Sequence, residues 1–254
     1  MQYKGKIKGK REKYLEKEKN FLVEKPFLHR GWHDIEKGIP ENSMKSFLLA
    51  MAEGYPIELD VHLLKDGTLV VIHDNNLKRL TGINKKLKDC TYEEIRNLTL
   101  ENTQEKIPLF REVLEAINGK VALDIEVKID QKANLIAPAV ARMLDSYTGN
   151  FLITSFNPFI LEWFKKHRPK YIRGQLVSNH NGDKIHKIVN WVLKNMLFNF
   201  ITKPEVIACN IKMLPSKEIQ REKEYGKIII GWTVKTEEDR EIAEKYCDNY
   251  ILDI

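Results

Sequence analysis

Cysteine is scarce in this sequence, and its spacing excludes a disulfide framework or a thiolate metal site. Cys90, Cys209 and Cys247 are an odd number of thiols, each far from the others along the chain. Small secreted domains carry paired cysteines, and structural zinc sites carry them at short spacings. We therefore expect buried or unreactive thiols in a reducing, cytoplasmic environment.

Long apolar runs and glycine-rich phosphate loops are also missing. No apolar run is long enough to span a bilayer, and the N-terminus lacks the hydrophobic core of a signal peptide. Neither common glycine-rich spacing occurs, which argues against a nucleotide-binding fold. The composition that remains, 43% hydrophobic and 31% charged, is that of an ordinary globular protein.

The charge is only mildly basic. A net charge of +6 suits an anionic substrate and favours nucleic acid only weakly, so no nucleic-acid partner is expected. Much of the excess lies in a basic lead over residues 1–25, where residues 4–19 hold eight Lys or Arg against three Glu. We expect a solvated terminal segment, with weak contact with an anionic membrane surface as the alternative.

Strand and helix patterns alternate regularly along the chain, which predicts parallel strands joined by crossover helices. Helices are expected at 44–53, 108–118, 134–146, 158–167, 184–198, 216–225 and 236–246. Eight parallel strands are expected at 27–31, 57–62, 121–128, 151–155, 172–177, 206–211, 228–234 and 250–253. That number favours a closed α/β fold, the (β/α)8 TIM barrel, over an open doubly wound sheet.

A hairpin follows the second of these strands. In IELDVHLLKDGTLVVIHD, residues 57–74, two apolar runs flank an Asp-Gly pair, a strong signal for an antiparallel return. Residues 75–107 are polar and read as a short insertion with one helix near 91–98. We therefore expect one domain, residues 1–254, with a hairpin and a small insertion.

The expected strands carry polar residues at their carboxyl ends, where the active sites of such barrels lie. In the first run of the hairpin, Ile57, Leu59 and Val61 share one face and the polar residues share the other. Strand 121–128 repeats this alternation. The polar strand-end residues are His29, Arg30, Glu58, Asp60, Asp124, Glu126, Lys128, Ser155, Trp232 and Asp253.

Three of these acids, Glu58, Asp60 and Glu126, would repel one another unless a cation lay between them. Carboxylate oxygens suit one hard divalent ion, Mg²⁺ or Ca²⁺, better than zinc, because no thiolate or imidazole is among them. Asp124 shares their face, but we expect it to lie deeper and leave it out of the site.

Arg30 and Lys128 stand beside these acids and are donors suited to a phosphate. His29 and His73 end buried strands, and two imidazoles near neutral pKa can serve as base and acid on the two sides of a phosphorus atom. The combination predicts cleavage of a phosphodiester, with a small-molecule phosphodiester as the partner. His33, His62, His167, His180 and His186 are expected to have local or surface roles.

The motif set His29-Arg30-Gly31, Pro40-Glu41-Asn42-Ser43, Glu58-Leu59-Asp60-Val61, Lys65-Asp66-Gly67, His73-Asp74, Glu126-Val127-Lys128 and Ser155-Phe156 resembles that of the glycerophosphodiester phosphodiesterases, in order and spacing. The resemblance runs from about residue 27 through Trp232 to the last strand. It implies a (β/α)8 barrel that hydrolyses glycerophosphodiesters, such as glycerophosphocholine and glycerophosphoethanolamine, to sn-glycerol 3-phosphate and an alcohol.

The resemblance also implies roles for individual residues. Catalytic acid and base are His29 and His73, in either order, and the metal ligands are Glu58, Asp60 and Glu126. Arg30 and Lys128 would contact the phosphate, Trp232 would form a wall near the glycerol, and Glu41 would support the site. The insertion is shorter than is usual in the family, which predicts a more open pocket.

Two other functions remain open. One is lysophospholipase D activity on lysophospholipids at a membrane surface, suggested by the basic lead and the apolar segment 191–201. The other is a non-catalytic barrel that serves as a binding module. Every ionisable residue that the resemblance requires is present, which argues against the second.

Overall fold

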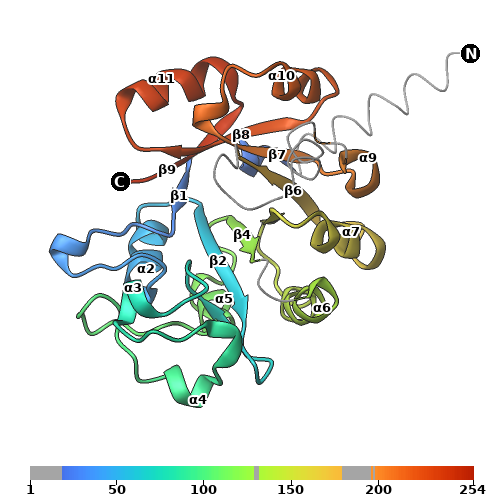
Figure 1. Cartoon of the computed structure of the whole chain (residues 1–254). Helices are drawn as coiled ribbons and strands as arrows, with labels where there is room; N and C mark the ends of the chain where they lie inside the picture. The colour runs from blue at the N-terminus through green and yellow to red at the C-terminus, as the bar shows by residue number, and fades with distance from the viewer. Residues whose placement is uncertain (1–18, 129–131, 179–195, 197) are drawn as a thin grey trace, which may run out of the picture.

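The computed structural model describes residues 19–128, 132–178, 196 and 198–254. In this part of the chain eight parallel strands close into a barrel, because β1 pairs with both β2 and β9 (Figure 1). The strands are β1 (Phe27–His29), β2 (Ile57–Leu63), β4 (Leu123–Val127), β5 (Phe151–Ser155), β6 (Ile172–Val177), β7 (Val206–Asn210), β8 (Ile228–Val234) and β9 (Asn249–Leu252). The expected (β/α)8 architecture is confirmed.

Helices surround the barrel, and their starts follow the capping residues of the sequence. The Ser43 side chain caps helix 44–52 by accepting from Ser46 N–H. The Asn157 side chain caps helix 158–167 by accepting from Phe159 N–H, and Pro158 is the first residue of that helix. The helices are α2 (Met44–Ala52), α5 (Phe110–Ile117), α6 (Ala133–Leu144), α7 (Pro158–His167), α9 (Asn199–Thr202), α10 (Lys217–Glu224) and α11 (Glu237–Tyr246). The helix expected at 184–198 and most of the basic lead fall outside the described residues. No described helix has the length and apolar character needed to cross a membrane.

The strands bury apolar side chains against the helices on their outer face. Leu59, Ile125 and Ile153 are fully buried there, in one cluster with residues of α2, α5, α6 and α7. The inner face of two strands is instead acidic. In the parallel register of β2 and β4, Glu58 pairs with Asp124 and Asp60 with Glu126. Side chains that alternate in the sequence therefore meet at one end of the barrel.

The hairpin is formed as expected, with β3 (Leu69–Val71) antiparallel to β2. Gly67 occupies its turn at a φ of 87°, a conformation that glycine adopts readily. The chain then forms α3 (Lys78–Thr81), a 3-10 turn (Leu87–Asp89) and α4 (Tyr92–Ile95). These pieces share a small apolar cluster with the hairpin and lie at the periphery beside the end of β2 (Figure 1).

Candidate active site

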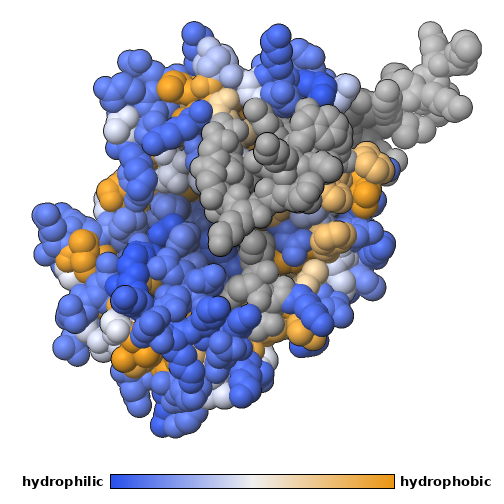
Figure 2. Space-filling model, viewed as in Figure 1, coloured by the Kyte–Doolittle hydropathy of each residue, from blue (hydrophilic) through white to orange (hydrophobic). Residues whose placement is uncertain are grey.

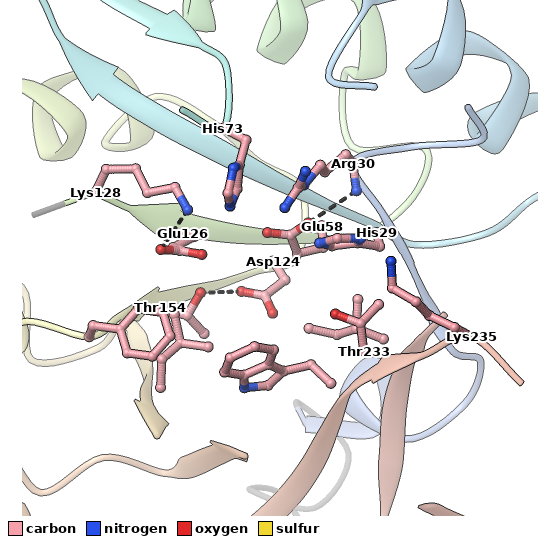
Figure 3. A pocket seen from close by; sticks show the side chains of 14 residues that line it. His29, Arg30, Glu58, His73, Asp124, Glu126, Lys128, Thr154, Thr233 and Lys235 are labelled. Carbon is pink, nitrogen blue, oxygen red and sulfur yellow. Dashed lines mark hydrogen bonds and ion pairs between the residues drawn. The ribbon is translucent and has the colours of Figure 1, made fainter. Parts of the chain in front are cut away.

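A cavity of about 340 Å³ opens at the carboxyl ends of the strands (Figure 3). Seven of the nine predicted site residues line it: His29, Arg30, Glu58, His73, Glu126, Lys128 and Trp232. The two others do not line the cavity but contact residues that do: Asp60 pairs with Arg30 and Lys128, and Glu41 pairs with Arg30. Asp124, Thr154, Phe156, Leu176, Thr233, Lys235 and Ile251 complete the wall. Ser155 does not line it, since its hydroxyl is buried and donates to Val127 O.

Glu58, Asp60 and Glu126 form a compact carboxylate cluster. One oxygen of each lies within 4.8 Å of the others, and all three side chains are buried. Burial, followed by the neighbouring acids, raises the pKa of Glu58 well above its usual value, and burial likewise raises that of Glu126. Burial also acts to raise the pKa of Asp60, but the neighbouring cations outweigh it and hold this carboxyl ionised.

Two cations face the cluster. Lys128 Nζ lies 2.7 Å from Asp60 Oδ1 and 2.9 Å from Glu126 Oε1, and Arg30 Nε lies 3.5 Å from Asp60 Oδ2. Three carboxylates against two cations leave a negative balance when all are ionised. An all-oxygen donor set with that balance fits a hard divalent cation.

Asn42 holds one of these acids in place. Its amide donates to Asp60 Oδ2 at 2.7 Å, and the residue is buried in a left-handed conformation with a φ of 53°. Asparagine tolerates that conformation better than most residues. In the sequence Asn42 is recognisable only as part of a motif, because its contact joins a loop to strand β2, 18 positions away.

Glu41 lies outside the carboxylate cluster. It accepts from Arg30 Nη1 at 2.8 Å and from both terminal nitrogens of Arg79, at 2.9 and 2.7 Å. Arg79 in turn donates to both oxygens of Asp74. Arg79 was not predicted, since nothing in the polar insertion signals that it reaches back to the site. Glu41 thus supports Arg30 from a network of ion pairs.

Each candidate catalytic histidine has an aspartate beside Nδ1. His73 Nδ1 lies 2.7 Å from Asp74 Oδ1, and His29 Nδ1 lies 3.4 Å from Asp253 Oδ2. Burial is the main cause that lowers the pKa of both imidazoles from the ordinary value of 6.5, so the neutral form dominates at neutral pH. His62 is buried, with Nε2 3.1 Å from His73 O, which is the local role expected of it.

Aromatic and aliphatic side chains form the opposite wall. The Phe156 and Trp232 rings meet edge to face with centroids 5.7 Å apart, and Trp232 Nε1 donates to Ala208 O. This wall gives a bound molecule an apolar side facing the charged one.

Asp124 pairs with Glu58 in the strand register, one pair below Asp60 and Glu126, and it lines the cavity. Thr154 donates to one of its oxygens at 2.7 Å, and burial raises the pKa of this carboxyl to about 7. The sequence could not show that the floor of the cavity reaches this level.

Comparisons with known proteins agree with this geometry. Residues 29–248 match the model of the Glycerophosphoryl diester phosphodiesterase family. A glycerophosphodiester phosphodiesterase from Caldanaerobacter subterraneus subsp. tengcongensis is 32% identical over 231 residues, 84% of this chain and 86% of that protein.

Solved structures are similar over most of the chain. The glycerophosphodiester phosphodiesterase from Thermotoga maritima superposes with a TM-score of 0.69 at 25% identity, over 89% of this chain and 92% of that one. A phosphodiesterase from Oleispira antarctica, in complex with the product sn-glycerol-3-phosphate, has the same fold, with a TM-score of 0.77 at 22% identity over 91% and 93% of the two chains.

Proposed function

This chain belongs to the glycerophosphodiester phosphodiesterase family, as the motif order predicted, and we propose that it cleaves glycerophosphodiesters to sn-glycerol 3-phosphate and an alcohol with the help of one divalent cation. The observation that carries the proposal is a single cavity that joins a carboxylate cluster, two cations and two histidines. The product seen in the Oleispira antarctica relative supports the choice of product.

Glu58, Asp60 and Glu126 would hold the cation, either Mg²⁺ or Ca²⁺. When bound, such an ion neutralises charge that develops on the phosphate oxygens. Arg30 and Lys128 offer further donors to the same oxygens.

His29 and His73 are the proposed acid and base. Asp74 and Asp253 are ionised and can only accept, so the Nδ1 proton of each neutral imidazole points to a carboxylate and Nε2 is left for the reaction. One imidazole takes at Nε2 the proton of the attacking glycerol 2-hydroxyl, while the other, protonated from solvent, gives its proton to the leaving alcohol. Water then opens the cyclic phosphate: the imidazole that is now neutral takes the water proton, and the protonated one returns its proton to the glycerol 2-oxygen. Trp232 forms the wall for the glycerol.

The test is release of sn-glycerol 3-phosphate from glycerophosphocholine and glycerophosphoethanolamine. Wild type, His29→Ala and Glu58→Ala are compared with EDTA and with added Mg²⁺ or Ca²⁺, and the exposed His167→Ala serves as a control. We expect metal-dependent release that both site variants abolish and the control retains. Release by Glu58→Ala at the wild-type rate, or in EDTA, would contradict the metal–carboxylate mechanism.

Lysophospholipase D activity is a second candidate, favoured by an apolar path that leaves the cavity. Phe156 and Leu176 also line a smaller adjoining cavity that reaches Phe198, whose ring meets that of Phe159 at 6.1 Å. Phe159 is 59% exposed, and hydrophobic residues gather along α6, α7 and α9 in Figure 2.

This second candidate has its own test. Hydrolysis of lysophosphatidylcholine should fall with Phe159→Ser, while hydrolysis of glycerophosphocholine stays unchanged. Leu48→Ser, an exposed leucine on α2, is the control. Equal rates of lysolipid hydrolysis in all three proteins would refute the path. The non-catalytic alternative is not retained, because the chain is a member of an enzyme family.

A further inference from the structure

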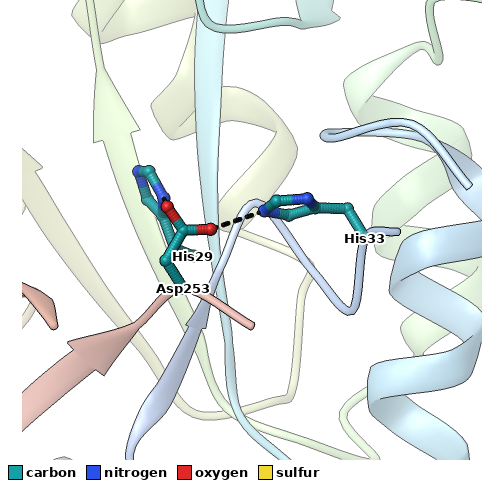
Figure 4. Close-up of side chains that lie close together, drawn as sticks. All are labelled: His29, His33 and Asp253. Atoms are coloured by element: carbon teal, nitrogen blue, oxygen red, sulfur yellow. Dashed lines mark hydrogen bonds and ion pairs between the residues drawn. The ribbon is translucent and has the colours of Figure 1, made fainter. Parts of the chain in front are cut away.

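A second cluster of titratable side chains lies beside the cavity, on the side of His29. Asp253, immediately after β9, lies beside His29 and His33 (Figure 4) and also pairs with Lys235. Its Oδ1 accepts from His33 Nε2 at 2.8 Å, and its Oδ2 lies 2.6 Å from Lys235 Nζ and 3.4 Å from His29 Nδ1. None of these contacts is needed to close the barrel, which the strand pairing already does.

The carboxylate is held by several partners besides His29. The backbone N–H of Asp253 donates to Val234 O at 2.9 Å, and two cationic or N–H donors hold its two oxygens. Burial acts to raise the pKa of Asp253, but His29, His33 and Lys235 together outweigh it and keep this pKa far below its usual value, so the carboxylate is an acceptor. A carboxylate held in this way can fix the orientation of the His29 imidazole, because it does not itself move with the ring.

His29 needs that acceptor. Its Nδ1 is buried and has no hydrogen bond within normal geometry among the described residues, and Asp253 is the carboxylate paired with it. The 3.4 Å separation is an ion-pair distance, longer than the 2.7 Å between His73 and Asp74. Contacts of catalytic groups are commonly long before substrate binds and shorten in the productive complex.

We propose that Asp253 is a positioning residue for His29, held in place by His33 and Lys235. It fixes the proton of the neutral imidazole on Nδ1, directs Nε2 into the cavity, and stabilises the imidazolium that forms during the reaction. The inference rests on the proposed function, in which His29 transfers a proton.

A competing explanation is a second cation site, since the ligand atoms of His29, His33 and Asp253 all lie within 4.8 Å of one another. The Lys235 ammonium argues against it, because Nζ already lies 2.6 Å from Asp253 Oδ2. A metal bound by this oxygen would have to displace that charge contact. The positioning role needs no such change.

The test is a double-mutant cycle on glycerophosphocholine hydrolysis. Asp253→Asn should lower kcat by about 10- to 100-fold, the size of loss seen when a partner that orients a metal-binding histidine is removed, with KM changed by less than about twofold. Asp248→Asn is the matched control, because Asp248 flanks the other end of β9, accepts from Ile229 N–H and pairs with Lys223. It should keep wild-type kcat.

On a His29→Gln background, Asp253→Asn should cost no further activity, because the two residues act as a unit. An equal loss on both backgrounds would show a merely structural effect and overturn the proposal. Loss of one bound metal ion per chain in Asp253→Asn would overturn it in favour of the cation site. If wild type itself shows no activity, the proposed function has failed instead.

A measurement on the wild-type protein keeps the proposal testable if Asp253→Asn does not fold. The ¹⁵N chemical shifts of labelled histidine, assigned by loss of the His29 signal in His29→Gln, report the tautomer of the neutral ring. We expect the proton on Nδ1. A proton on Nε2 would overturn the inference.

Discussion

Removing one carboxylate from the cluster should separate metal binding from catalysis. Glutamine at position 58 keeps the size of the side chain and an oxygen that can accept from Arg30 N–H, as Glu58 does at 3.0 Å, but it loses the charge. A cation at about 100 times its Kd adds about 2.7 kcal/mol to the stability of the folded state. For a chain of this size each kcal/mol raises Tm by roughly 2–4 °C, so wild type should gain about 5–11 °C.

In the Glu58→Gln variant the same addition of Mg²⁺ or Ca²⁺ should shift Tm by less than about 2 °C. In EDTA this variant should melt above wild type, because the carboxylates lie within 4.8 Å of one another, where two like charges repel by on the order of 3 kcal/mol at an effective dielectric of 20, and Arg30 and Lys128 offset this only partly. Differential scanning fluorimetry gives both numbers. Asp124→Asn is the matched control, since it removes a buried acid outside the cluster and should keep the metal shift. A full metal shift in Glu58→Gln would refute the assignment of the ligands.

Three further outcomes are expected. Gly31→Ala should lower Tm more than Gly67→Ala. Both glycines have positive φ, but a Cβ at Gly31 would lie 2.6 Å from Ser46 Oγ, which costs about 1–3 kcal/mol of stability. A Cβ at Gly67 would meet open space. The pKa of Asp74 is lowered from 3.8 to about 2, chiefly by Arg79, so the stability that this carboxylate contributes is full above pH 4 and is lost as pH falls towards 2. Between pH 5 and pH 3 wild type should therefore lose about 1 kcal/mol of unfolding free energy, after allowing for partial exposure. Asp74→Asn should not show this loss when urea unfolding is measured at the two pH values. Arg79→Met should lower kcat several-fold, because it releases the carboxylate beside the second histidine, and unchanged steady-state rates would contradict that role.

The barrel could be predicted because its signals are local. Most strands are short segments rich in apolar residues and bounded by turn residues, whereas every second residue of β2 and β4 is an acid or a base. Since parallel strands end at one rim, Glu58, Asp60 and Glu126 could be placed together without coordinates. The hairpin followed from Asp66-Gly67 in the same way.

The supporting contacts could not be predicted, because they join residues that are far apart in sequence and belong to no periodic pattern. Arg79 reaches Glu41 across 38 positions, and Asp253 reaches His33 across 220. Asp253 was recognised only as a polar residue at the end of the expected last strand, 250–253. Which neighbour it meets depends on how the barrel closes, and on rotamers that no spacing rule fixes.

The insertion over residues 75–107 has a consequence for engineering. Its apolar side chains pack with those of the hairpin in a cluster separate from the barrel core. Its contact with the site is made by Arg79, which forms ion pairs with Glu41 and Asp74. Segments after Thr81 could therefore be exchanged between homologues, or randomised in a library, without disturbing the machinery of the barrel. None of residues 82–107 lines the cavity, so such exchanges would leave the side chains of the site unchanged.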